Sequence, residues 1–224
     1  MAPVPVHHRR ELDGTPRDVS RRASVGPRTL SGALHAPRSG LRRRGLHQED
    51  VRRERALRLH GVDASEAAIA QARRELVGAR FETRLLVGDM LAFLRDGATQ
   101  GPRTFDIILA SYTIHHLPAR EKSELLRHAH AKLSPHGSLL HGDIFRRNGE
   151  SRDEFLAGYT SMMRQSWTAM ARDALAGAVE HVTQRDIPET VESLTALARD
   201  AGLAGPTELF RDATGFHRLL AFET

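Results

Sequence analysis

Four short apolar segments between residues 57 and 145 decide the fold. They read Leu-Arg-Leu-His-Gly-Val-Asp (57–63), Phe-Glu-Thr-Arg-Leu-Leu-Val-Gly-Asp-Met (81–90), Phe-Asp-Ile-Ile-Leu-Ala-Ser (105–111) and Gly-Ser-Leu-Leu-His-Gly-Asp (137–143). Helix-like stretches separate these segments, and strands that alternate with helices predict a parallel sheet with helices on its faces. In such sheets ligands bind beyond the carboxyl ends of the strands. The polar residues that end each segment therefore predict a small-molecule site.

The rest of the chain from residue 57 is read from helical spacing, caps and turns. The run at 105–110 is almost wholly apolar, which predicts a strand buried on both faces. Two final runs at 206–210 and 216–223 enclose Asp-Ala-Thr-Gly and predict a hairpin. Helices are expected from a cap at Ser65 to near Gly78, at 90–95, from Pro118 to Pro135, along one long stripe at 155–170, and at 188–202.

The first 56 residues differ in composition from the rest. They hold 13 arginines and six acidic residues but no Phe, Trp or Tyr, whereas the totals of 33 basic and 28 acidic residues leave 20 and 22 for 57–224. So few large apolar groups cannot offset the entropy lost on ordering, which predicts a disordered segment. Alternatives are an arginine-rich arm for RNA or acidic membrane and an aberrant start from a frameshifted gene. The predicted domain, 57–224, carries no net basic charge that would favour nucleic acid.

Cysteines and long apolar runs are both absent from the sequence. Without cysteine, disulfides, thiolate zinc sites and cysteine nucleophiles are excluded, and this usage is typical of a cytoplasmic protein. No run of about 18 apolar residues occurs, so no membrane span is expected. Arg9 and Arg10 are not followed by the apolar segment of a secretory signal. The sequence leaves the oligomeric state open.

Asp63 and Asp89 each follow a predicted strand, where a carboxylate would face a ligand. A carboxylate accepts two hydrogen bonds from a vicinal diol, so Asp63 suits a ribose, and the small Ala64 lets a ligand lie close. Asp89 is placed to accept from the exocyclic amine of an adenine while the Met90 thioether packs on the ring. An aspartate at a strand end is also a common helix cap or turn former. Their order along successive strands predicts an adenosine site.

These segments resemble the class I S-adenosylmethionine-dependent methyltransferases. The likeness lies in the second-strand motif Gly-Val-Asp-Ala-Ser (61–65), the third-strand motif Gly-Asp-Met (88–90), the fourth-strand motif at 105–111 with Ile-His-His-Leu-Pro (114–118), and the Leu-x-Pro-Gly-Gly turn at 133–140. In that turn His136 stands where a glycine is usual. The resemblance covers about residues 57–223 and implies S-adenosylmethionine as cofactor. It assigns cofactor contacts to Asp63, Ala64, Asp89, Met90 and Ser111.

The resemblance also implies a Rossmann-like α/β fold, with a mostly parallel sheet, helices on both faces and an antiparallel C-terminal strand. The family's first strand ends in a loop like Asp/Glu-x-Gly-x-Gly-x-Gly, which should begin near residue 40. There the chain reads Arg-Ser-Gly-Leu-Arg-Arg-Arg-Gly (38–45), and no Gly-x-Gly occurs in 1–56. The first, central strand and the loop that holds the methionine end of the cofactor are therefore predicted to be missing.

Histidines and aromatic residues supply the remaining candidates. His116 is a candidate general base because histidine titrates near neutral pH, although a loop histidine that shapes the pocket floor is the plainer interpretation. No carboxylate lies at familiar ligand spacing from His115, His116, His128 and His130, so no metal is expected. Because this family commonly adds a substrate cap after the fifth strand, 146–185 is a candidate cap. Candidate substrate contacts are Tyr112, His116, Tyr159 and Trp167.

The sequence thus predicts methyl transfer from S-adenosylmethionine to an O, N or C nucleophile of a small molecule. A nicotinamide-dependent short-chain reductase would share the sheet, but neither Tyr112 nor Tyr159 has a lysine four residues on. The stronger alternative is an inactive methyltransferase-like protein, retained as a scaffold or produced by a frameshifted gene.

Overall fold

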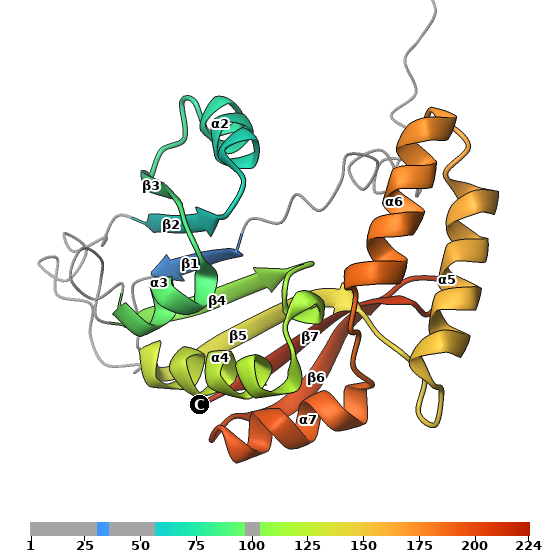
Figure 1. Cartoon of the computed structure of the whole chain (residues 1–224). Helices are drawn as coiled ribbons and strands as arrows, with labels where there is room; N and C mark the ends of the chain where they lie inside the picture. The colour runs from blue at the N-terminus through green and yellow to red at the C-terminus, as the bar shows by residue number, and fades with distance from the viewer. Residues whose placement is uncertain (1–30, 36–56, 97–103) are drawn as a thin grey trace, which may run out of the picture.

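The computed structural model describes residues 57–96 and 104–224, together with the backbone of 31–35. Within these residues the fold is a seven-stranded mixed sheet with helices on both faces (Figure 1). The strands are β1 Ser31–His35, β2 Arg58–Asp63, β3 Glu82–Val87, β4 Phe105–Ser111, β5 Leu133–Ile144, β6 Ala204–Arg211 and β7 His217–Glu223. The helices are α2 Glu66–Glu75, α3 Met90–Asp96, the 3-10 helix η3 Ile114–His116, α4 Ala119–Lys132, α5 Arg152–Ser166, α6 Arg172–Arg185 and α7 Val191–Asp200.

The four strands expected between 57 and 145 all run in one direction. The sheet order is β3-β2-β1-β4-β5-β7-β6, in which β2 is parallel to β3 and β4 is parallel to β5. Because β1 is antiparallel to both β2 and β4, those two strands also point the same way. Their carboxyl ends therefore meet at one edge, as predicted. The closing hairpin is confirmed too, since β7 pairs antiparallel with both β5 and β6.

The prediction of a missing central strand needs a correction. β1 fills the place between β2 and β4, where Ala33 pairs with His60 on one side and with Ile108 on the other. Its direction opposes that of both neighbours, so it is not the parallel strand that the resemblance implies. Ser-Gly-Ala-Leu-His lacks the apolar alternation by which a strand is recognised in sequence. Residues 1–30 and 36–56, with the predicted disordered segment and the Gly40 region, lie outside the described residues.

The helices begin close to the predicted starts. The Ser65 side chain caps α2 by accepting a hydrogen bond from the Ala68 amide, and Pro118 directly precedes α4. The helix expected over 155–170 is present as α5, which ends four residues earlier, at Ser166, and the sequence did not predict α6, which begins at Arg172. The chain leaves the helix at Trp167, whose side chain packs on the buried cluster under α5.

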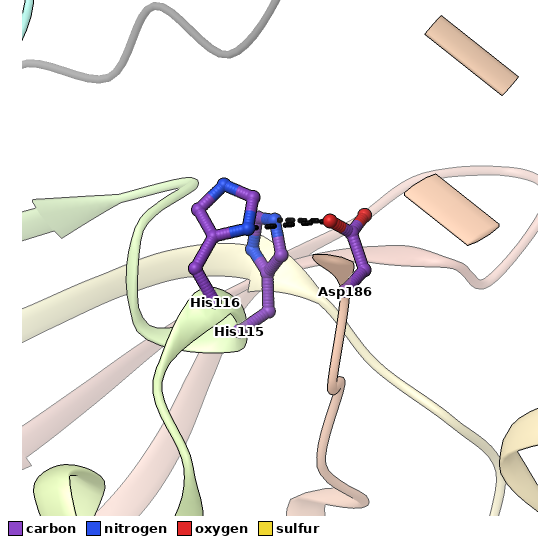
Figure 2. A group of neighbouring side chains, drawn as sticks. All are labelled: His115, His116 and Asp186. Carbon is purple, nitrogen blue, oxygen red and sulfur yellow. Dashed lines mark ion pairs between the residues drawn. The ribbon is translucent and has the colours of Figure 1, made fainter. Parts of the chain in front are cut away.

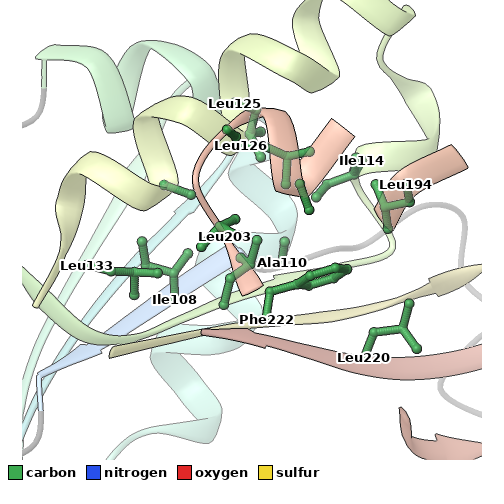
Figure 3. Packing of buried hydrophobic residues seen from close by; sticks show 14 of the residues in the cluster. Ile108, Ala110, Ile114, Leu125, Leu126, Leu133, Leu194, Leu203, Leu220 and Phe222 are labelled. Atoms are coloured by element: carbon green, nitrogen blue, oxygen red, sulfur yellow. The ribbon is translucent and has the colours of Figure 1, made fainter. Parts of the chain in front are cut away.

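The main core lies between the sheet and a layer formed by α3, α4 and α7 (Figure 3). On the other face, α2 covers β2 and β3 through a small cluster of Ile69, Ala72 and Leu85 (Figure 1). The prediction that β4 is buried on both faces holds for one face only. Ile108 is buried, whereas Ile107 and Leu109, which point the opposite way, are half-buried among the described residues.

α5 and α6 form a separate pair at one end of the molecule, beside the carboxyl ends of β4 and β5 (Figure 1). Their cluster contains Phe155, Tyr159 and Met163 from α5, Val182 from α6, and Ile144 from the end of β5. This pair therefore sits next to the edge where ligands bind in α/β sheets. In the described part of the chain, no helix is both long and apolar enough to cross a membrane.

Candidate functional site

Asp63 lies buried at the carboxyl end of β2, and its two carboxylate oxygens have different surroundings. Oδ1 accepts a hydrogen bond of 2.7 Å from the Ser65 amide, whereas Oδ2 is buried without a hydrogen-bond partner among the described residues. Burial raises the pKa of Asp63, and the Ser65 hydrogen bond opposes this shift. A buried acceptor with no partner is costly unless a ligand satisfies it. Asp63 therefore fits the ribose role, with the exposed Ala64 beside it.

Asp89 and Met90 lie where α3 begins. Asp89 Oδ1 accepts a hydrogen bond of 2.8 Å from the Ala92 amide, so this carboxylate does act as the helix cap of the plainer interpretation. Met90 Sδ accepts a hydrogen bond of 3.0 Å from the hydroxyl of Thr113, in the loop after β4. That contact brings the Met90 thioether to the same strand end as Ser111, which is half-buried and pairs with Gly142.

Tyr112 follows β4 in a strained backbone conformation. Its φ of 48° lies in the left-handed region, which bulky residues rarely adopt. The Tyr112 amide donates to the Gly142 carbonyl at 2.7 Å, and its hydroxyl lies 3.0 Å from His217 Nδ1. Burial, with a smaller effect of the Asp143 carboxylate, raises the pKa of Tyr112 to about 12. Strain of this kind is concentrated at functional sites, which keeps Tyr112 a candidate contact.

His115 and Asp143 form a buried pair where β4 and β5 end. His115 Nδ1 makes a short hydrogen bond with Asp143 Oδ1, and the His115 amide donates to Oδ2 at 3.2 Å. Burial by itself lowers the pKa of His115, but the charge of Asp143 and its hydrogen bond outweigh burial and raise it. Burial raises the pKa of Asp143, yet the charge and hydrogen bond of His115, together with the charge of His141 and the Ile144 amide, hold it below the usual range. Asp143 ends a predicted strand, and this position is the feature of the sequence that marks it as a possible site residue.

A second carboxylate, Asp186, reaches the histidines from the end of α6 (Figure 2). Its Oδ1 lies 3.2 Å from His116 Nδ1, 3.6 Å from His115 Nε2 and 4.0 Å from His181 Nε2. Asp186 is 2% exposed, and Oδ1 makes no hydrogen bond of acceptable geometry within the described residues. Sequence spacing could not reveal this carboxylate, because three helices and a strand separate it from His116 in the chain.

The sequence predicts no metal because no carboxylate lies at a familiar ligand spacing from His115 and His116, and the structure corrects this reason. No carboxylate lies near them in the sequence, but the fold brings Asp186 against His115 and His116. One nitrogen of each histidine and one Asp186 oxygen all lie within 4.8 Å of one another.

Residues 186–189 are held in place by hydrogen bonds from several elements. The Ile187 amide donates to the His115 carbonyl at 2.7 Å, which fixes Asp186 beside η3. Arg152 Nε donates to the Asp186 carbonyl at 2.8 Å, and Lys122 Nζ, on a fully buried side chain, bonds the Ile187 carbonyl and Glu189. The carboxylate of Asp186 is thus positioned by its backbone before any ligand arrives.

The other two candidate substrate contacts lie in the cluster under α5. Tyr159 is 4% exposed and packs between Phe155 and Phe216, with ring centroids 5.3 Å from each. Trp167 is half-buried against the same cluster. These positions agree with the core role that such a stripe usually has, so a substrate contact at either residue stays a prediction.

Comparison with known proteins identifies a related domain and a related fold. Residues 46–139 match a family described as "Methyltransferase domain". The carboxy-S-adenosyl-L-methionine synthase of Wolinella succinogenes is 28% identical over 160 residues, and the match covers 69% of this chain and 61% of that protein. The chain thus spans less than two thirds of the length of this curated relative.

Among solved structures, the fold is similar to that of a possible exported protein from Bordetella parapertussis. The TM-score is 0.50 at 16% identity, over 74% of this chain and 52% of the other. An O-methyltransferase family protein from Burkholderia thailandensis gives a TM-score of 0.47 at 19% identity, over 70% of this chain and 41% of the other. At this level of identity the first likeness shows the fold alone.

Proposed function

We propose that this chain is a class I S-adenosylmethionine-dependent methyltransferase and that it transfers a methyl group from S-adenosylmethionine to a small-molecule nucleophile. The observation that carries the proposal is the buried Oδ2 of Asp63, which lacks a partner among the described residues at the carboxyl end of β2. This residue lies inside the matched methyltransferase region, 46–139. The matched domain favours an enzyme over the inactive alternative.

The adenosine half of the cofactor fits the residues present. In this proposal Asp63 Oδ2 accepts a hydrogen bond from the ribose, and Ala64 leaves room beside it. Met90 packs against the adenine, and Ser111 lies at the neighbouring strand end, while one oxygen of Asp89 is already engaged as a helix cap. The cofactor, when bound, supplies an electrophilic methyl group on a sulfonium. The predicted position of the loop for its methionine end lies outside the described residues.

The acceptor is proposed to lie between the loop after β4 and the pair α5 and α6. Supporting this, Asp186 at the end of α6 lies against His115 and His116 of η3. Residues 146–185 then act as the substrate cap, with Tyr112, Tyr159 and Trp167 as candidate contacts. Transfer to a good nucleophile needs mainly proximity and alignment. In this proposal the loop after β4 and the pair α5 and α6 hold the acceptor in place on either side. His116, half-buried beside Asp186, is the candidate to accept a proton from an acceptor hydroxyl or amine.

We further propose that the acceptor atom is O, N or C and that the protein is cytoplasmic. Cell fractionation tests the location. The acceptor is tested by incubating the chain with labelled S-adenosylmethionine and panels of small hydroxylated or amino compounds.

Calorimetric titration of the full chain with S-adenosylmethionine tests the proposal first. We expect saturable heat with affinity in the micromolar range, and mass spectrometry should then detect S-adenosylhomocysteine and a methylated acceptor. Absence of binding contradicts the proposal. Formation of carboxy-S-adenosyl-L-methionine, the product in the name of the Wolinella relative, would replace methyl transfer with a different reaction at the same cofactor site.

A further inference from the structure

We propose that His115, His116, Asp186 and His181 bind a divalent transition metal ion, with zinc as the best match to three imidazoles and one carboxylate. The four side chains come from η3, from α6 and from its C-cap, and Figure 2 shows His115 and His116 directed at the Asp186 carboxylate. Cofactor binding as proposed above does not require this ion. The two proposals share His116, because an imidazole that binds the ion has no free lone pair left to accept a proton from the acceptor.

The hydrogen bond from His115 to Asp143 is the first argument. If Nδ1 carries the proton of the neutral ring and donates it to Asp143, Nε2 presents a lone pair. That lone pair faces Asp186 Oδ1 at 3.6 Å, and this oxygen makes no hydrogen bond in the described part of the chain. In that tautomer two acceptors face each other in a buried place, and a metal ion between them binds both. A metal-bound histidine that donates its other ring nitrogen to a carboxylate has the same arrangement.

The spacing of the ligand atoms is the second argument. A tetrahedral zinc ion with bonds of about 2.0–2.2 Å to nitrogen and oxygen holds its ligand atoms about 3.4 Å apart. Asp186 Oδ1 lies 3.2, 3.6 and 4.0 Å from the nitrogens of His116, His115 and His181, which brackets that separation. His181 Nε2 is itself buried with no hydrogen-bond partner among the described residues. His115, His116 and Asp186 therefore already lie at ligand spacing, and His181 is the fourth ligand of the proposal.

Hydrogen bonds fix the buried ligands of the proposed metal site, and two of its histidines are partly exposed to solvent. The His115 amide donates to Asp143, which fixes η3 to the end of β5. The Ile187 amide donates to the His115 carbonyl, which fixes Asp186 beside η3. The side chains of His116 and His181 are 27% and 36% exposed, which leaves an entry path for the ion. Nitrogen with a single oxygen ligand suits zinc, cobalt or nickel better than magnesium or calcium, which prefer all-oxygen sites.

Cobalt titration tests the metal site, because Co²⁺ replaces zinc in such sites and its visible absorption reports four-coordinate nitrogen and oxygen ligation. The full chain, without a histidine tag and freed of metal by chelation, is titrated with Co²⁺ in the absence of S-adenosylmethionine. We expect one high-affinity Co²⁺ per chain, displaced by Zn²⁺. Asp186→Asn and His116→Ala should each weaken Co²⁺ binding at least about tenfold.

His128→Ala is the matched control, since His128 is also half-buried and pairs with a carboxylate, Glu124, at 3.7 Å. Its Co²⁺ affinity should equal that of the unsubstituted chain. Circular dichroism checks folding, and if Asp186→Asn unfolds, the half-buried His116→Ala decides. Absence of Co²⁺ uptake, or equal affinity in the chain and in folded Asp186→Asn or His116→Ala, overturns the proposal and leaves a protonated His115 between Asp143 and Asp186. Because no cofactor is present, failure of S-adenosylmethionine binding does not affect this result.

Discussion

At the residue scale, the same kind of side chain performs different tasks according to its hydrogen bonds. Asp89 uses one carboxylate oxygen as a helix cap, whereas Asp63 keeps one buried oxygen without a partner in the described residues. Asp143 is bonded to His115, and Asp186 Oδ1 faces three imidazoles without a hydrogen-bond partner among the described residues. Only Asp63 and Asp186 therefore retain a buried carboxylate oxygen suited to a ligand among these four.

Asp63→Ala is predicted to weaken S-adenosylmethionine binding by about 1.5–3 kcal/mol, because it removes a charged hydrogen-bond acceptor. Calorimetric titration measures the change. Asp63→Asn is the companion variant, since its amide oxygen keeps the Ser65 hydrogen bond while the charge is lost. It should also bind the cofactor more weakly, without a lower melting temperature, because burial disfavours the charged form of Asp63. Unchanged cofactor affinity in both variants would count against the ribose role.

His136→Gly is predicted to stabilise the chain by up to about 1 kcal/mol, since His136 has a φ of 66° where a glycine carries no steric cost. The His136 amide still donates to Thr224 Oγ1, so the turn keeps its hydrogen bond. Gly137→Ala is the opposing variant, because its Cβ would lie 2.8 Å from the Ser134 carbonyl oxygen and should cost about 1–3 kcal/mol. Urea unfolding compares the two, and a destabilised His136→Gly contradicts the strain argument.

At the element scale, one buried ion pair joins α4 to the segment before α7. Lys122 of α4 is fully buried, and its Nζ lies 2.9 Å from Glu189 Oε1 while also bonding the Ile187 carbonyl. Burial raises the pKa of Glu189, but the hydrogen bonds from Lys122 and Ser193, together with the charges of Lys122 and Arg146, outweigh burial and lower it. The pair thereby positions the stretch that carries Asp186 next to η3.

Glu189→Gln is predicted to destabilise the chain by about 3 kcal/mol at pH 7, because it leaves a buried ammonium without its carboxylate. The lowered pKa of Glu189 means that its contribution is complete above the unfolded value of about 4.5 and is lost as pH falls through the folded value. Unfolding free energy measured from pH 7 to pH 3 should therefore fall more steeply in the unsubstituted chain than in Glu189→Gln. Lys122→Met combined with Glu189→Gln should recover part of the loss, and parallel pH profiles would contradict the assignment.

At the scale of the whole molecule, the sheet depends on a short strand that runs against its neighbours. β1 links the β2 and β3 side, with Asp63, to the β4 and β5 side, with His115 and Asp143. The cofactor residues and the acceptor residues proposed here therefore face one another only while β1 stays paired on both sides.

Ala33→Pro is predicted to separate the two halves of the sheet, because proline cannot donate a ladder hydrogen bond in a central strand. Hydrogen exchange should speed up at the amides of β2 and β4 next to Ala33, and S-adenosylmethionine affinity should fall. Ala33→Ser keeps the backbone donor and is the control. Equal exchange protection in Ala33→Pro and the unsubstituted chain would show that β1 does not join the sheet.

Local pattern was enough to predict most elements from residue 57 onward. Apolar runs placed β2 to β5 and the final hairpin, and Ser65 and Pro118 marked helix starts, because these signals depend on neighbours in the chain. Asp63 was identified for the same reason, since it directly follows a recognisable strand. The resemblance to class I methyltransferases rests on the order of these motifs.

Tertiary structure alone decided what came from distant parts of the chain. β1 was not recognised because its pairing with β2 and β4, not its own composition, makes it a strand. The end of α5 at Ser166 was not predicted, and Asp186 lies beside His115 and His116 where the Ile187 amide bonds the His115 carbonyl. Sequence spacing describes contacts along one element, whereas the proposed metal ligands are brought together by the folding of several.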